Sequence, residues 1–90
     1  SAWVSSSGGS DSNDGLSEAK AVKTIAKGVS LIRHGYPDWL LFKRGDTWNQ
    51  GFGQLQKCGR STTEMMLLST YGTNPERPKF LITNGMGIEM

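Results

Sequence analysis

The sequence predicts a mainly β protein with a single helix near its N-terminus. Short apolar strings begin near residues 39, 52, 65 and 79, so they recur about every thirteen or fourteen residues, and glycine-rich turns separate them. Apolar residues at helical spacing occur only in an earlier stretch. A regular alternation of strands and turns without intervening helices is typical of a sandwich, a barrel or a β-solenoid, and periodicity alone does not choose among them.

The first elements are a short strand and a helix. Serine and glycine dominate residues 1–17, which predicts a strand at residues 2–5 followed by a turn-rich loop. A helix is expected over residues 17–35, with Ser17 as its N-cap and Leu16 placed to form a hydrophobic staple. The apolar positions at helical spacing are Val22, Ile25, Ala26, Val29 and Ile32.

The rest of the chain is expected to consist of strands. The four predicted strands cover residues 39–43, 52–56, 65–70 and 79–83. Several of them are apolar without clean alternation, which is typical of strands buried on both faces or packed inside a solenoid.

Composition excludes several classes of protein. The 90 residues suffice for one small domain, and 18 of them are Leu, Ile, Val or Phe, which lies at the edge of what folding requires. The net charge of +2 is scattered, so neither nucleic acid nor a membrane surface is expected as a partner. The longest apolar run has four residues, too few for a transmembrane helix. One cysteine and one histidine provide neither an internal disulfide nor a structural zinc set.

Three polar side chains form a candidate metal site. Asp11, Asn13 and Asp14 precede Gly15 and could offer oxygen ligands to calcium. The spacing departs from a calcium-binding EF-hand loop, because Val22 stands where that loop needs its bidentate glutamate. The alternative is an Asx-rich turn in which these side chains accept hydrogen bonds from the backbone. No other cofactor is expected.

The order of several segments carries a resemblance to a known family. The segments are WVS at 3–5, GSDSNDGLS at 9–17, KTIA at 23–26, GYPDWLLFKRGDTW at 35–48, STYG at 69–72 and RPK at 77–79. In this order they resemble the N-terminal portion of right-handed parallel β-helix proteins of the pectate-lyase superfamily.

The resemblance implies a fold and a function. It implies a first strand and loop in residues 1–16, a helix capping the open end of a solenoid in residues 17–35, and the first one or two β-helix coils in residues 36–90. Family members run to several hundred residues and carry catalytic residues in central coils. The resemblance therefore implies the N-terminal framework part of a secreted polysaccharide-acting or polysaccharide-binding protein. The parent would be a polysaccharide lyase or glycoside hydrolase, and these 90 residues alone would not be catalytic.

A second hypothesis follows from the physics of a short solenoid. A last coil with no neighbour leaves its backbone N–H and C=O groups unpaired, and such an edge favours pairing with another copy. The alternative function is accordingly a self-assembling structural protein, a homo-oligomer joined through exposed coil edges. A third hypothesis, that the chain is a complete lyase or hydrolase, lacks a persuasive set of catalytic side chains.

Aromatic side chains are candidates for stacking on sugar rings, and the alternative is that they serve packing. Trp48 and Phe52 fall in a glycine-rich turn, where exposure is expected, and Tyr71 is a further candidate. Trp39 lies inside an apolar strand and is expected in the core.

Lys43 and Arg44, at the end of a predicted strand, are the candidate basic residues for substrate binding. Lysine and arginine often act as bases in β-helix lyases. The simpler interpretation is a turn at Gly45 with a local bond from the Asp46 carboxylate to the backbone.

Overall fold

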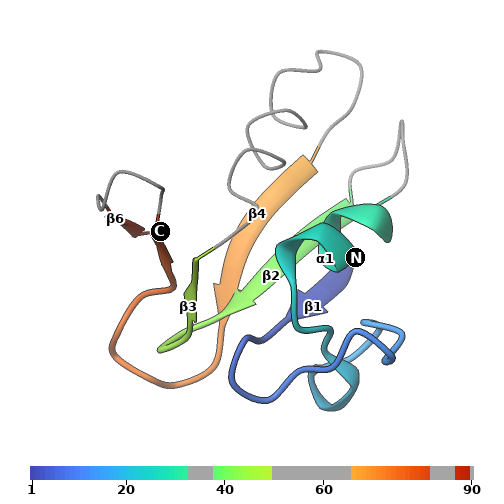
Figure 1. The fold of residues 1–90 in the computed structure, drawn as a ribbon, viewed down its shortest axis with the longest axis horizontal. Helices are drawn as coiled ribbons and strands as arrows, with labels where there is room; N and C mark the ends of the chain where they lie inside the picture. The colour runs from blue at the N-terminus through green and yellow to red at the C-terminus, as the bar shows by residue number, and fades with distance from the viewer. Residues whose placement is uncertain (33–37, 50–65, 82–86, 90) are drawn as a thin grey trace.

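The structure is a computed structural model that describes residues 1–32, 38–49, 66–81 and 87–89. Strands account for most of its regular structure, and helix is scarce (Figure 1). The elements are β1 (Ala2–Val4), the 3₁₀ helix η1 (Glu18–Lys20), α1 (Ile25–Ser30), β2 (Asp38–Lys43), β3 (Thr47–Trp48), β4 (Met66–Tyr71), β5 (Lys79–Leu81) and β6 (Gly87–Glu89).

These strands form two small sheets. The first has the order β1-β2-β4 with every pair parallel, and the second has the order β3-β5-β6, in which β3 and β5 are parallel and β6 is antiparallel. β2 pairs with β4 and β3 pairs with β5, so the unit formed by β2, its turn and β3 lies beside the unit formed by β4, its turn and β5. The prediction of a mainly β fold is confirmed, because most of the regular structure is strand. The pairs within the sheets are chiefly parallel. The predicted strand at residues 52–56 lies outside the described residues.

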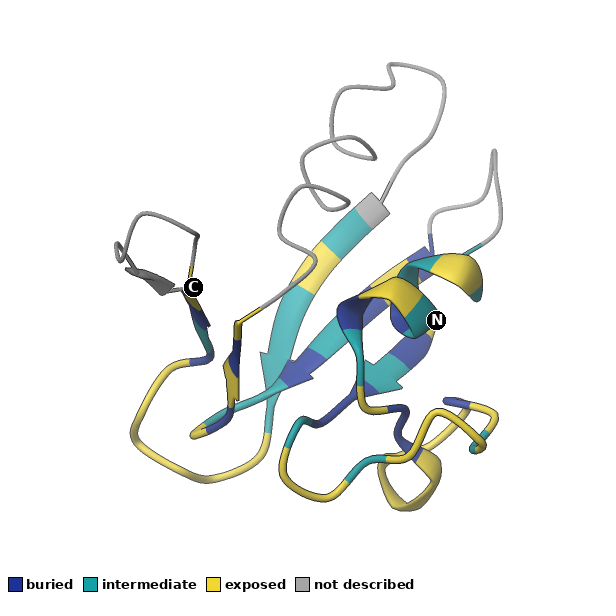
Figure 2. Cartoon of the chain, viewed as in Figure 1, coloured by how far each residue is buried: buried dark blue, intermediate teal, exposed yellow. Residues whose placement is uncertain are grey.

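The core combines buried residues of both sheets with buried residues of the segment 22–25, and Figure 2 colours the buried residues dark blue. Phe42, from the first sheet, presents its ring edge to Trp48 and to Phe80 of the second sheet at centroid distances of 5.2 and 5.0 Å. Trp48 and Phe80 are register partners in β3 and β5, and their rings stack at 5.5 Å. The other fully buried members of this cluster are Ala2, Val4, Val22, Ile25 and Leu40. Burial of such large rings supplies the main favourable free energy of folding in a domain of this size.

The helix predicted over residues 17–35 is wrong in its extent. The structure has the three-residue 3₁₀ helix η1 and the six-residue helix α1, with residues 21–24 between them. The cause is the edge of β1: the Val22 N–H donates to the Trp3 carbonyl at 2.9 Å, and the Val22 carbonyl accepts from the Ser5 N–H at 2.8 Å. These sheet-like bonds, with a parallel bridge from Val4 to Val22, replace the helical bonds that the apolar spacing favoured.

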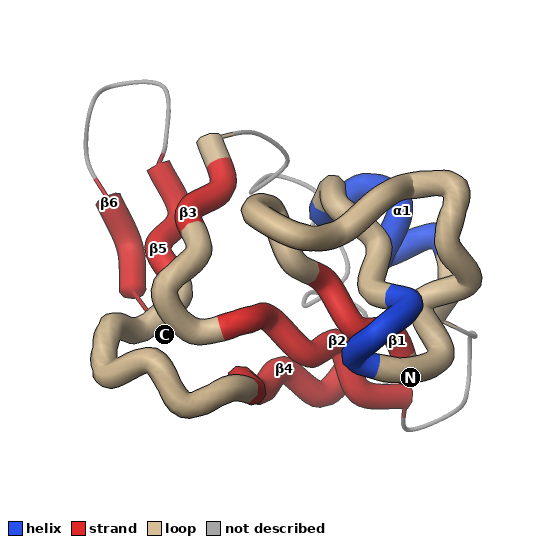
Figure 3. The backbone as a smooth tube through the Cα atoms, turned by 90° about the horizontal axis from the view of Figure 1, so that it is seen from below, coloured by secondary structure: helices blue, strands red, loops and turns tan. Residues whose placement is uncertain are grey.

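The capping predictions fail for the same reason. Ser17 makes no side-chain capping bond, and Leu16 is 72% exposed, so there is no hydrophobic staple. The N-cap of α1 is Thr24, whose hydroxyl accepts a hydrogen bond from the Lys27 N–H at 3.1 Å. A helix of six residues has little intrinsic stability, and α1 depends on its packing against the β1 side of the core, away from β4 and β5 (Figures 1 and 3).

The turn after β1 generates a first prediction, about Gly9. A Cβ atom at Gly9 would overlap the backbone carbonyl oxygens of Ser5 and Val22, whereas a Cβ at Gly8 would find its nearest neighbour 3.7 Å away. Gly9→Ala should therefore lower the free energy of unfolding by at least ~2 kcal/mol, because backbone must move to admit the methyl group. Gly8→Ala is the matched control and should change it by less than ~1 kcal/mol. Urea denaturation followed by tryptophan fluorescence measures both, and equal effects would contradict the packing described.

Candidate functional site

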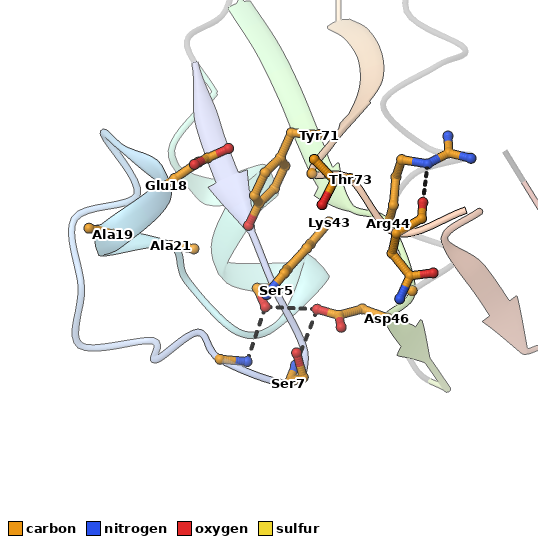
Figure 4. A pocket seen from close by; sticks show the side chains of 14 residues that line it. Ser5, Ser7, Glu18, Ala19, Ala21, Lys43, Arg44, Asp46, Tyr71 and Thr73 are labelled. Carbon is orange, nitrogen blue, oxygen red and sulfur yellow. Dashed lines mark hydrogen bonds between the residues drawn. The ribbon is translucent and has the colours of Figure 1, made fainter. Parts of the chain in front are cut away.

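A polar groove lies at the carboxyl ends of β1, β2 and β4. Because these strands are parallel, the segments that follow them meet at one edge of the first sheet, and η1 closes the groove on one side (Figure 4). The groove has a volume of about 690 Å³. Its lining is Ser5, Ser7, Gly8, Glu18, Ala19, Ala21, Lys43, Arg44, Gly45, Asp46, Tyr71, Gly72, Thr73 and Asn74.

Asp46 anchors the floor of the groove. Its side chain is almost fully buried, at 7% exposure of the residue, and Oδ2 accepts hydrogen bonds from the Ser5 hydroxyl at 2.7 Å and the Ser7 N–H at 3.2 Å. The Ser5 hydroxyl oxygen in turn accepts from the Gly8 N–H at 3.0 Å. Asp46 thus joins the loop after β1 to the turn after β2. The expected local bond to the backbone is replaced by these distant partners, while the predicted turn at Gly45 is confirmed by its φ of 88°.

Hydrogen bonds keep the Asp46 carboxylate ionised. Burial acts to raise the pKa of Asp46, but the hydrogen bonds from Ser5 and Ser7 and the nearby charge of Lys43 outweigh it. The pKa of Asp46 therefore lies below its ordinary value of 3.8. At neutral pH the groove holds a buried negative charge with its hydrogen-bond partners in place.

Arg44 is committed to the neighbouring turn. Its Nε donates to the Asn74 carbonyl at 2.7 Å and its Nη2 to the Pro75 carbonyl at 3.0 Å. The Arg44 backbone N–H also donates to the Tyr71 carbonyl at 2.9 Å. These bonds fasten the turn after β2 to the turn after β4. The structure does place Lys43 and Arg44, the two basic candidates, together in the groove (Figure 4).

Tyr71 places a phenol inside the groove. Partial burial, followed by the negative charges of Asp46 and Glu18, raises the pKa of Tyr71 to about 12, against the opposing effect of a hydrogen bond with Ser5. The phenol is therefore protonated at neutral pH and can donate a hydrogen bond. The Tyr71 ring meets the Trp3 ring edge-on at 4.8 Å, which fixes its direction.

The other aromatic candidates have different positions from those predicted. Trp48 is 2% exposed and donates from Nε1 to the Lys23 carbonyl at 3.0 Å, so the expectation that its side chain is exposed is wrong. It belongs to β3, where alternation turns Thr47 outward and Trp48 into the core. Trp39, expected in the core, is 42% exposed because its neighbours in β2 point inward. Phe52 lies outside the described residues.

The three candidate calcium ligands each bond to the protein itself. Asp11 accepts from the Lys23 N–H at 2.8 Å, the Thr24 N–H at 2.9 Å and the Thr24 hydroxyl at 2.7 Å, and so supports the start of α1. Asn13 donates to the Ala21 carbonyl, and Asp14 accepts from the Leu16 N–H two residues ahead, as an Asx turn does. Within the described ranges, no group of three or more His, Cys, Asp or Glu side chains could hold a metal ion.

Sequence reasoning missed the residues that complete the groove. The missed residues come from the loop after β1, from η1 and from the turn after β4, and the parallel register brings them to one edge; they are Ser5, Ser7, Glu18, Thr73 and Asn74. The available signal was the position of polar residues just after each predicted strand.

Comparison with protein-family models gives no match for this chain, and comparison with curated proteins gives none. Among the segments that the structure describes, no helix has the length and apolar character that a membrane crossing requires. Fold and groove together define a small, mainly β protein with parallel sheets and a polar site at their carboxyl edge.

The Asp46 anchor generates a second prediction, about acid stability. The pKa of Asp46 is lower in the folded state than in the unfolded state. The stabilisation that the Asp46 carboxylate gives the fold is therefore fully present above its unfolded pKa and is lost as pH falls through its folded pKa. Asp46→Asn should lower the free energy of unfolding by about 1–3 kcal/mol at pH 7. The further decrease in this free energy below about pH 4 should be smaller in the variant than in the wild type. Urea denaturation at several pH values measures this. An acid profile of Asp46→Asn that matches the wild-type profile would contradict the assignment.

Proposed function

We propose that the chain forms the capped start of a right-handed parallel β-helix, the N-terminal framework of a secreted protein that binds or acts on polysaccharide. The observation that carries the proposal is the repetition of one unit in both sheets at once. Residues 38–43 pair in parallel with residues 66–71, and Thr47 and Trp48 pair in parallel with Lys79 and Phe80. Stacked units with shared register and continuous inward side chains are the pattern of a solenoid.

The two ends of this stack differ, which supports a cap on one side. The outer edge of β1 is paired: the Trp3 N–H donates to Gly15, the Trp3 carbonyl accepts from Val22, and the Ser5 N–H donates to Val22. At the other end, β4 is the last strand of its sheet among the described residues. Leu68, which continues the row of the buried Leu40, is 42% exposed there. A further coil on the β4 side would bury it.

The polar groove supports the carbohydrate part of the proposal. It offers the Tyr71 phenol, the Thr73 hydroxyl and the Asn74 amide within one concavity at the end of the parallel strands. Hydroxyl-rich ligands need such directional donors and acceptors beside aromatic surface. The basic residues present are used for structure or line the wall, so the proposal assigns binding to this part of the chain and no bond-breaking step.

The third prediction tests polysaccharide binding with a blocked groove. The purified chain is run in a series of native gels, each containing one neutral or acidic polysaccharide. At least one of these polymers should retard it. Ala19→Trp should abolish the retardation, because Ala19 is exposed on η1 and lines the groove. Ala26→Trp is the matched control, since Ala26 is exposed on α1 outside the groove, and it should be retarded like the wild type. Folded protein that no polymer retards, or equal retardation of the Ala19 variant, would overturn the proposal.

A second candidate function, self-assembly, is favoured by the edge of β4. This strand reads MLLSTY and carries no charge at neutral pH, so two copies meet without like-charge repulsion. Head-to-tail stacking is blocked because the β1 edge is already paired. Two copies would therefore join β4 to β4 around a twofold axis, in antiparallel register centred on Leu68, which keeps the inward faces aligned.

The fourth prediction tests this assembly by sedimentation velocity over a range of concentrations. A concentration-dependent dimer is expected, and Leu68→Lys should abolish it because an inward charge on an edge strand opposes pairing. Leu81→Lys is the control, since Leu81 is equally exposed but lies in β5. A monomer at all concentrations, or a dimer that survives Leu68→Lys, would contradict assembly through β4.

A further inference from the structure

The charges that line the polar groove balance. Lys43 and Arg44 contribute two positive charges, and Glu18 and Asp46 contribute two negative ones. All four side chains lie within one groove, so a ligand there meets no excess of either sign (Figure 4).

Two of the four charges are already engaged inside the protein. The Arg44 guanidinium donates to the Asn74 and Pro75 carbonyls at 2.7 and 3.0 Å. The Asp46 carboxylate accepts from Ser5 and Ser7 at 2.7 and 3.2 Å and is almost fully buried. A ligand could recruit either group only by breaking hydrogen bonds that hold the surrounding turns together, which is costly for a buried carboxylate.

The groups left to meet a ligand are of mixed kind. Lys43 and Glu18 have opposite charges, and Figure 4 draws the Tyr71 ring between them. The Thr73 hydroxyl and the Tyr71 phenol, which also has a hydrogen bond with Ser5, are neutral and can both donate and accept hydrogen bonds. An anionic polymer would gain from one lysine and lose from the glutamate, whereas a neutral polyol can bond to all of these groups.

We propose that the polar groove binds an uncharged saccharide and discriminates against acidic ones. The inference rests on the proposed function, because it names the class of polysaccharide that the same groove would take. Discrimination arises because Arg44 is engaged by the neighbouring turn and Lys43 lies close to Asp46, so a uronate carboxylate that approaches Lys43 also meets the negative charges of Asp46 and Glu18.

The test is isothermal titration calorimetry of the whole chain with two oligosaccharides of equal length, the neutral xylohexaose and the acidic hexagalacturonate. Each is titrated at about 20 and 300 mM NaCl. Xylohexaose should bind with a Kd that changes less than about twofold between the two salt concentrations, and hexagalacturonate should bind at least about tenfold more weakly. Tyr71→Phe, which removes one hydroxyl, should weaken xylohexaose binding about threefold to tenfold. Thr47→Val removes an exposed hydroxyl outside the groove and is the matched control, with no change in Kd expected.

The outcomes separate this inference from the proposal beneath it. Tighter binding of hexagalacturonate, with a Kd that rises steeply with salt, would overturn the neutral-saccharide inference and leave polysaccharide binding standing. Binding of neither probe, by a chain that also fails to bind any polymer in the gel panel, would overturn both. Equal losses in Tyr71→Phe and Thr47→Val would place the saccharide elsewhere and overturn the inference.

Discussion

The structure depends on one constraint, the simultaneous parallel register of two successive units. Pairing β2 with β4 places Leu40 beside Leu68, and Trp48 still lies on Phe80 in the second sheet although the turn after β4 is four residues longer than the turn after β2. A slip of one residue would turn the large rings outward and lose the core that holds α1. In a chain with so few large aliphatic residues, this alignment is what makes a closed core attainable.

The polar groove is a by-product of the same register. Parallel strands bring the turns after them to one edge, and Asp46 and Arg44 then fasten those turns to one another. Asp46 reaches back to the loop after β1, and Arg44 reaches forward to the turn after β4. Hydrogen bonds from Asp46 and Arg44 to the surrounding loops therefore hold the groove in shape. The lining that a ligand meets has no net charge.

Local patterns predicted the strands and missed much of their context. The apolar strings at residues 39–43 and 65–70 correspond closely to β2 and β4, because a run of buried side chains is a local property. The long helix was wrong since Val22 is used by the edge of β1, a partner that helical spacing does not register. Trp39 was expected to be buried and is exposed, and Trp48 was expected to be exposed and is buried. Which face of the sheet a strand residue occupies changes with a shift of one position, and an apolar run does not show which face each residue takes. The sequence pointed to Lys43, Arg44, Asp46 and Tyr71 of the groove lining, and the other members were missed because they meet through long-range pairing.

The closed edge of β1 has a consequence for the order in which the molecule is made. Its bonds run from residues 3–5 to residues 15–22, so they connect segments close in sequence and can form while the ribosome is still adding β2. Once they form, the free flank of β1 is the edge to which β2 adds in parallel, and β4 then adds in parallel to β2. Synthesis from the N-terminus and growth of the first sheet would then advance together, in the order β1, β2, β4.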